Sequence, residues 1–151
     1  MTAKADRYLS IERYPDFLTR ACQLAHLYDL RTQRSDNIDF FLIGADFAIL
    51  FLLERDGASL CYVDLASPQP LRYSLGHFLY AHRRTKEISY PGPHQSLPPS
   101  VKIPIELDFL LDLLGSSPDI LRGSRDWLLE YQLSKESVPL HWLNDLRPSE
   151  Q

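Results

Sequence analysis

The sequence lacks the short motifs that most often identify an enzyme or a cofactor-binding protein. Only six glycines are present, and their spacing fits neither the GxGxxG dinucleotide-binding fingerprint nor the phosphate-binding P-loop. No GxSxG element is present to expose a nucleophilic serine, although serine, histidine and aspartate all occur in the chain. These absences weaken an enzymatic interpretation, and they leave open a site of an unfamiliar type.

Residues that could bind a metal are few and badly spaced. His77 and His82 are five residues apart, so they lie on different faces of a helix and on opposite faces of a strand. The paired histidines of an HExxH motif share one helix face. His26, His94 and His141 each stand alone in the sequence. We therefore expect no metal site and no cofactor.

Cysteine is scarce as well. The two cysteines, Cys22 and Cys61, are far apart and form no CxxC pair. Each falls on a predicted apolar face, so we interpret both as reduced thiols in the core.

Basic residues are fewer than acidic residues. The chain has 16 Lys and Arg against 20 Asp and Glu, a net charge of −4 at pH 7. A nucleic-acid binder needs basic side chains to neutralise phosphates, so we expect no nucleic-acid partner. The basic run over 82–86, flanked by Tyr80 and Tyr90, resembles a nucleic-acid patch in composition only. We interpret it as a solvated helix end, where the helix dipole stabilises cations.

A long apolar run is missing too. The most apolar stretch, Phe40–Leu53, has 14 residues with Asp46 in its middle, whereas a membrane-spanning helix needs about 20 apolar residues. The first 14 residues carry charges but no apolar core of the kind found in a secretory signal. We expect no membrane partner and a cytoplasmic protein.

Length and composition fit one domain. The 151 residues are 44% apolar and 24% charged, which is ordinary for a globular protein of this size. We predict a single α+β domain over residues 1–151, with residues 1–13 loosely ordered. No internal repeat or linker divides it.

The strongest structural signal is the stretch Ile38–Leu65, which we interpret as three antiparallel strands. Asp56-Gly57 suits the centre of a type I′ turn, which would pair Leu53 with Leu60. Gly44-Ala45 suits a second tight turn, of type II′. A buried helix is the alternative, because a continuous apolar run is ambiguous by periodicity alone.

Both faces of the segment Phe47–Leu53 are apolar, so we expect it to be the central strand, covered on two sides. Side chains alternate along a strand, which divides the hairpin into two sets. One set is Ala48, Leu50, Leu52, Cys61, Val63 and Leu65; the other is Phe47, Ile49, Phe51, Leu53, Leu60 and Tyr62.

Helical periodicity and proline positions predict the other elements. In chain order they are a helix from Pro15 to about Arg31, a polar loop over Thr32–Asn37, a short edge strand at Leu71–Tyr73, a helix from Ser74 to about Arg84 with a strand over Gly76–His82 as the alternative, helices over Pro104–Leu114 and Ser117 to about Ser134, and a short amphipathic piece over Val138–Leu146. The predicted fold is a three- to four-stranded antiparallel meander packed with an N-terminal helix and two or three C-terminal helices.

A proline-rich stretch over 89–104 contains Pro91, Pro93, Pro98, Pro99 and Pro104. Structureless connections of this length are usually functional or mobile. We interpret it as a stiff surface connection, and it could cover a ligand pocket.

Asp108 and Asp112 are four residues apart, so they repel each other on one helix face. Asp112 also lies near the negative end of the predicted helix dipole. An unfavourable arrangement without visible compensation can mark a functional site, although most such pairs are simply solvated. The predicted partner-binding residues are Asp108, Asp112, Glu106, Asp119, Tyr90 and His94. We predict no catalytic residues.

Three classes of function fit these features. The first is a binding protein that neutralises or regulates a protein partner by occlusion, as bacterial immunity proteins do against toxins; the analogy is compositional, since no shared motif supports it. The second is a small-ligand-binding or enzymatic domain with a pocket under residues 89–104. The third is a structural subunit of a homodimer, so monomer and homodimer both stay open. We favour the first class and lean against an enzyme.

Overall fold

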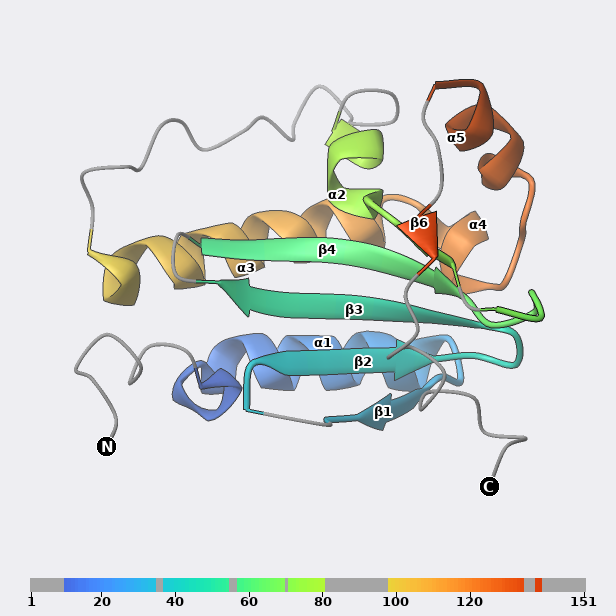
Figure 1. The fold of residues 1–151 in the computed structure, drawn as a ribbon. Coiled ribbons are helices and arrows are strands. Elements are labelled where there is room, and N and C mark those ends of the chain that lie inside the picture. The colour runs from blue at the N-terminus through green and yellow to red at the C-terminus, as the bar shows by residue number, and fades with distance from the viewer. Residues whose placement is uncertain are drawn as a thin grey trace.

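A computed structural model describes residues 10–34, 37–54, 57–69, 71–80, 98–134 and 138–139 of the chain. Within these ranges the molecule is an α+β fold in which helices pack against an antiparallel sheet, as predicted (Figure 1).

The sheet has six strands in sequential order. They are β1 (Arg31–Gln33), β2 (Asp39–Ile43), β3 (Phe47–Glu54), β4 (Gly57–Asp64), β5 (Leu71–Tyr73) and β6 (Val138–Pro139). The meander of β2, β3 and β4 and the short strand β5 were predicted, whereas β1 and β6 add two more strands than the sequence indicated. Residues 31–33 had been assigned to the end of a helix and the start of a polar loop. Both added strands are very short, so neither is long enough to show an alternating pattern.

The β3–β4 hairpin keeps the predicted faces in a different register. Leu53 pairs with Ala58 and Phe51 with Leu60, because Gly57 belongs to β4 and pairs with Glu54. The predicted pairing of Leu53 with Leu60 is therefore wrong by two residues. A shift of two leaves every side chain on its original face, since side chains alternate with a period of two. The predicted division into two faces is confirmed.

The turn between β2 and β3 also differs from the prediction. Gly44 pairs with Phe47 and donates its N–H to the Phe47 carbonyl at 2.9 Å, so Ala45 and Asp46 form the turn. Gly44 has no positive φ, which excludes the predicted type II′ turn. Glycine is required here for space, because a Cβ at this position would collide with the Phe47 ring.

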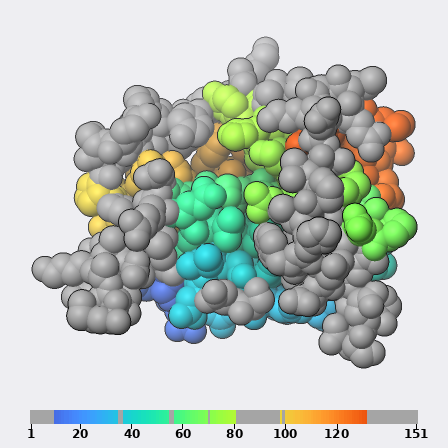
Figure 2. Space-filling model, in the orientation of Figure 1, coloured from blue at the N-terminus to red at the C-terminus, as the bar shows by residue number. Residues whose placement is uncertain are grey.

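Strand β3 is buried on both faces, as expected for the interior of the sheet. The larger core lies between the sheet and the helices, and Phe17 of α1 (Pro15–Leu27) packs edge-on against Phe51 at 5.0 Å. Helices α1 and α3 (Pro99–Gly115) run side by side behind the sheet (Figure 1). The second cluster is made only of residues from β2 to β4 and Leu65, among those the structure describes. Figure 2 shows this side of the molecule, with the central strands (cyan to green) at its middle.

The helices begin and end at other residues than predicted. Helix α1 stops at Leu27, and Asp29 follows with a positive φ of 58°. Helix α3 starts at Pro99, so Pro104 lies inside it and residues 99–104 are helical rather than part of a surface connection. The earlier start places Ile103 in the core, fully buried. Four leucines of α3 are buried in the core: Leu107, Leu110, Leu111 and Leu114.

Four smaller elements complete the described helices. Ile11–Arg13 forms the 3-10 helix η2, in which Ile11 is fully buried. Helix α2 spans Leu75–Phe78, and its predicted extension to Arg84 lies beyond the described residues. The single helix predicted from Ser117 is two helices, α4 (Pro118–Leu121) and α5 (Trp127–Ser134), separated by Gly123 with a φ of +94°.

The two cysteines have different environments. Both are free, and Cys61 is buried in the second cluster, where burial raises the pKa of its thiol. Cys22 is exposed, so its predicted place in the core is wrong. The buried positions of α1 are Phe17, Ala21 and Ala25, and Cys22 lies about 100° around the helix from Ala21.

The helices of the described ranges include none long and apolar enough to cross a membrane.

Candidate functional site

Helix α3 carries a different polar group on each of its two flanks. One flank faces α1 and contains the predicted pair Asp108 and Asp112. The other faces β4 and α2 and contains Glu106 at the edge of a cavity.

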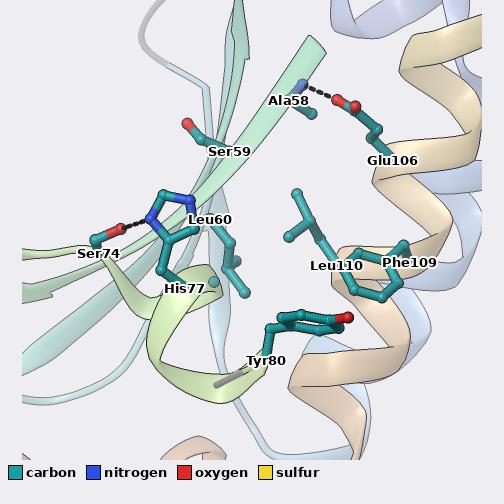
Figure 3. Close-up of a pocket in the computed structure, with 10 residues that line it drawn as sticks. Ala58, Ser59, Leu60, Ser74, His77, Tyr80, Glu106, Phe109 and Leu110 are labelled. Carbon is teal, nitrogen blue, oxygen red and sulfur yellow. Dashed lines mark hydrogen bonds between the residues drawn. The ribbon is translucent and has the colours of Figure 1, made fainter. Parts of the chain in front are cut away.

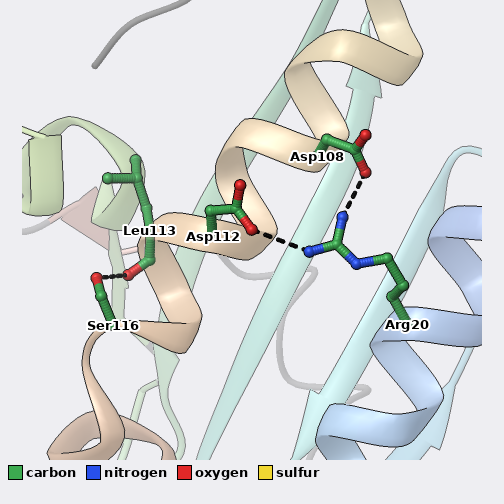
Figure 4. A network of polar contacts seen from close by, with 5 residues as sticks. All are labelled: Arg20, Asp108, Asp112, Leu113 and Ser116. Atoms are coloured by element: carbon green, nitrogen blue, oxygen red, sulfur yellow. Dashed lines mark hydrogen bonds and ion pairs between the residues drawn. The ribbon is translucent and has the colours of Figure 1, made fainter. Parts of the chain in front are cut away.

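Arg20 of α1 lies between the two aspartates (Figure 4). Its Nη1 donates to Asp108 Oδ1 at 2.6 Å and its Nη2 donates to Asp112 Oδ1 at 2.9 Å. One guanidinium therefore binds two carboxylates one helical turn apart. The repulsion noted in the sequence is compensated by a residue 88 positions away from Asp108.

The Arg20 network is open to solvent and keeps an excess negative charge. The side chains of Asp108 and Asp112 are 61% and 54% exposed, and that of Arg20 is 44% exposed. Each aspartate uses one oxygen for Arg20, and the second oxygen has no hydrogen-bond partner among the described residues. Two carboxylates against one guanidinium leave a net charge of −1. The arrangement holds two acceptor oxygens in fixed positions on the surface.

The other predicted partner-binding residues are not gathered at this network. Glu106 is only 8% exposed and faces the opposite flank of α3. Asp119 lies in α4, partly buried. Tyr90 and His94 fall outside the described residues. The structure thus brings Asp108 and Asp112 together and separates Glu106 from them, while their role in partner binding stays a prediction.

A cavity of about 430 Å³ opens between β4, α2 and α3 (Figure 3). Leu60 and Leu110 line it from the sheet and from α3, and Tyr80 and Phe109 form an aromatic wall with ring centroids 5.7 Å apart. Gly76 lets α2 approach closely, because a Cβ there would lie 3.3 Å from Leu110 Cδ2. The lining is mainly apolar with a few polar groups, as is typical of ligand sites.

Of the lining residues in the described part of the chain, Glu106 is the only acidic one. Its Oε1 accepts a hydrogen bond from the N–H of Ala58 at 2.9 Å. Gly57 makes this contact possible, because a Cβ on Gly57 would collide with the Glu106 carboxylate. Glu106 Oε2 has no hydrogen-bond partner in the described part of the chain. The Glu106 side chain is nine-tenths buried, and its second oxygen is left accessible to solvent or to a ligand in the cavity.

Ser74 and His77 form a polar pair elsewhere on the cavity wall. Ser74 Oγ and His77 Nδ1 are 3.1 Å apart, and the Ser74 N–H donates to Tyr131 Oη at 3.1 Å. No carboxylate among the described residues is hydrogen-bonded to His77, so the pair lacks the third group that orients the histidine of a catalytic triad. The pair supplies polar contacts rather than an activated nucleophile.

A third polar group lies at the far end of β4. Arg125 Nη2 donates a hydrogen bond to Asp64 Oδ2 at 2.7 Å. This contact gives the Asp64 carboxylate, whose side chain is only 7% exposed, a partner of opposite charge. The same contact raises the pKa of the Arg125 guanidinium. The salt bridge compensates the burial of the Asp64 carboxylate. Its role is structural.

Metal ligands do not gather anywhere in the described ranges: no three His, Cys, Asp or Glu side chains lie close enough to hold an ion.

Comparison with known proteins gives no relative. No protein family model, no curated protein and no solved structure matches the chain.

The cavity was not visible in the sequence, because its walls come from three separate elements. Two glycines, Gly57 and Gly76, were the signals in the sequence that could have pointed to it, because each occupies a buried position where neighbouring groups approach the backbone closely.

Proposed function

We propose that this chain is a binding protein that neutralises or regulates a protein partner by occlusion, as an immunity protein does with a toxin. The contact surface is the outer side of α1 and α3, around Arg20, Asp108 and Asp112. The observation that supports the proposal most is that Arg20 holds the two exposed carboxylates in fixed positions while one oxygen of each stays available.

Preorganisation is what makes this surface suitable for recognition. A flexible surface aspartate loses side-chain entropy when it binds a partner, and that loss reduces affinity. Arg20 has already restrained both aspartates, so a Lys or Arg of the partner meets carboxylates that need little further ordering. Its guanidinium or ammonium would add to the network and balance the excess negative charge.

The chain's charge supports the same kind of partner. A net charge of −4 attracts a basic protein at long range, and complementary charge raises association rates and sets specificity. A toxin that acts on nucleic acid presents basic residues of this kind around its active site. The cytoplasmic location expected from the sequence is part of the proposal, and the two free cysteines are compatible with it.

The test is an affinity capture from the native host with three versions of the chain as bait. These are the wild type, the double variant Asp108→Asn/Asp112→Asn, and the control Asp126→Asn, which removes one exposed carboxylate outside α1 and α3. We expect the wild type and the control to retain the same stoichiometric protein partner. The double variant should lose it while unfolding at a similar temperature, because exposed ion pairs contribute about 0–1 kcal/mol each to stability.

Two results would contradict the proposal. One is that no stoichiometric protein is retained by any version. The other is that a retained partner binds the double variant as tightly as the wild type, which would move the contact to another surface.

A second candidate function is the binding of a small ligand in the cavity between β4, α2 and α3. The observation that favours it is a mainly apolar space of about 430 Å³ with Glu106, His77 and Tyr80 on its walls. This volume lies within the range of about 300–1,000 Å³ that is usual for ligand sites. The two candidates use opposite flanks of α3, so one chain can have both functions.

A further inference from the structure

The cavity between β4, α2 and α3 has a chemistry that selects its ligand. We infer that it binds a free small molecule that carries a protonated amine on an apolar, preferably aromatic, body. The inference rests on the second candidate function, ligand binding in this cavity, and is independent of the proposed protein partner.

The charge of the cavity indicates a cation. Among the described residues that line the cavity, Glu106 is the only acidic one and none is Lys or Arg, and Glu106 is about nine-tenths buried. The Ala58 N–H satisfies Oε1, whereas Oε2 has no partner among the residues described. A buried carboxylate is costly unless it is paired or fully hydrogen-bonded. An ammonium group supplies both the opposite charge and the missing donors.

The rest of the cavity indicates an apolar body. Leu60 and Leu110 offer aliphatic surface, and the rings of Tyr80 and Phe109 are close enough to form one aromatic wall. An aromatic group packs favourably on such a wall, and an ammonium near a ring face gains a further cation–π attraction. A free carboxylate ligand would be repelled by Glu106, and a neutral ligand, even one that donates a hydroxyl to Oε2, would leave the negative charge of Glu106 uncompensated.

Backbone groups of β4 fix the position of the Glu106 carboxylate. Helix α3 aims it at the start of β4, the Ala58 N–H fixes one oxygen, and Gly57 leaves the space that the carboxylate occupies. Figure 3 shows the carboxylate directed at Ala58, with Tyr80 and Phe109 further along the same cavity. A charge held in this way is preorganised for a ligand.

The experiment compares three probes of nearly equal shape on the intact chain. They are 2-phenylethylamine, 2-phenylethanol and 3-phenylpropionate, and binding is measured by saturation-transfer NMR and by isothermal titration. We expect the amine to bind at least tenfold more tightly than the alcohol and the carboxylate not to bind, because a hydrogen bond to a charged group is worth at least a factor of ten.

Two variants test whether the preference for the amine depends on the charge of Glu106. Glu106→Gln keeps the size of the side chain and an acceptor for the Ala58 N–H but removes the charge, so the preference for the amine over the alcohol should disappear. Asp16→Asn removes an exposed charge of the same sign elsewhere on the chain and should leave the preference unchanged. If Glu106→Gln does not fold, the preference among the three probes on the wild type still decides the inference.

The outcomes separate this inference from the function on which it rests. Equal binding of amine and alcohol overturns the cation preference and leaves ligand binding in place. Failure of all three probes to bind overturns both. A blocked lysine, with its backbone amine acetylated, serves as a fourth probe: if it binds more tightly than 2-phenylethylamine, the cavity takes the side chain of a protein partner and the assignment of a free amine is wrong.

Discussion

Replacing Gly57 with alanine tests how the β3–β4 hairpin and Glu106 depend on each other. Gly57 has a φ of +148°, a conformation that residues with a Cβ rarely adopt, and a Cβ there would collide with Glu106 Oε1. The variant must therefore strain the backbone and also displace the carboxylate that accepts the Ala58 N–H. Gly57→Val adds a branched side chain and should cost more.

The magnitude follows from these two effects. A non-glycine residue in a glycine-only region of φ and ψ costs about 1–3 kcal/mol. Loss of a hydrogen bond to a charged group costs about 1.5–3 kcal/mol. The lower entropy of the unfolded alanine chain offsets about 0.4–1 kcal/mol, so the net loss should be about 2–5 kcal/mol. That is a large part of the stability of about 5–15 kcal/mol that is typical of a domain.

Urea unfolding followed by circular dichroism measures this loss as a change in the free energy of unfolding. The matched control is Gly115→Ala at the last residue of α3, where a Cβ would have no neighbour within 4 Å. Because alanine is favoured over glycine in helices, the control should be neutral or slightly more stable. Equal stability of Gly57→Ala and the wild type would refute the reasoning.

A double-mutant cycle then separates the collision from the backbone strain. In a Glu106→Ala background the collision is absent, so Gly57→Ala should cost less by about 1.5–3 kcal/mol, the value of the hydrogen bond. If the cost is the same in both backgrounds, Glu106 does not depend on Gly57.

Three further predictions concern other polar and titratable groups. Asp64→Ala should lower the free energy of unfolding by about 2 kcal/mol in urea titrations, because it removes the partner of Arg125; no change would mean that the salt bridge is not structural. Burial raises the pKa of Tyr62 and of Cys61, so the unfolded chain loses these protons first, and stability should fall as pH rises above about 9. Unfolding measured from pH 7 to 11 should show a shallower fall in Tyr62→Phe, and an unchanged profile would disprove the assignment. Arg20→Ala should lower the free energy of unfolding by less than about 1 kcal/mol and yet weaken partner binding. A larger loss of stability would show that the ion pairs of Arg20 are mainly structural.

The sequence was most informative where burial imposes a pattern on every residue. Strand β3 is apolar on both faces, and this pattern, together with the turn signals on either side of it, predicted a strand in the interior of the sheet. The register was wrong by two residues, since Asp56-Gly57 suggested a turn centred one residue too late. The assignment of side chains to the two faces of the sheet was still correct, because side chains alternate with a period of two residues.

Short edge strands could not be predicted from the sequence, for a physical reason. Strand β1 has three residues, Arg31–Gln33, all of them polar and largely exposed. Its conformation is imposed by pairing with β2 and not by its own composition. Propensity is a weak guide for such a segment.

The candidate sites were predictable only in part. The spacing of Asp108 and Asp112 predicted that they share one helix face, but Arg20, which binds both, is separated from Asp112 by 92 positions and could not be predicted as their partner. Glu106 was grouped with them as a surface residue, whereas its hydrogen bond to the Ala58 N–H places it against the sheet. Which side of α3 each carboxylate faces depends on the helices beside it, and these were placed by the structure.

The most direct test of occlusion by a preorganised acidic surface is the association rate of the captured partner as a function of ionic strength. Stopped-flow measurements from about 20 to 500 mM salt should show the rate for the wild type falling steeply, because salt screens attraction between complementary charges. The Asp108→Asn/Asp112→Asn variant should associate more slowly at low salt and with a weaker salt dependence. Identical rates and identical salt dependence for the two proteins would contradict the account.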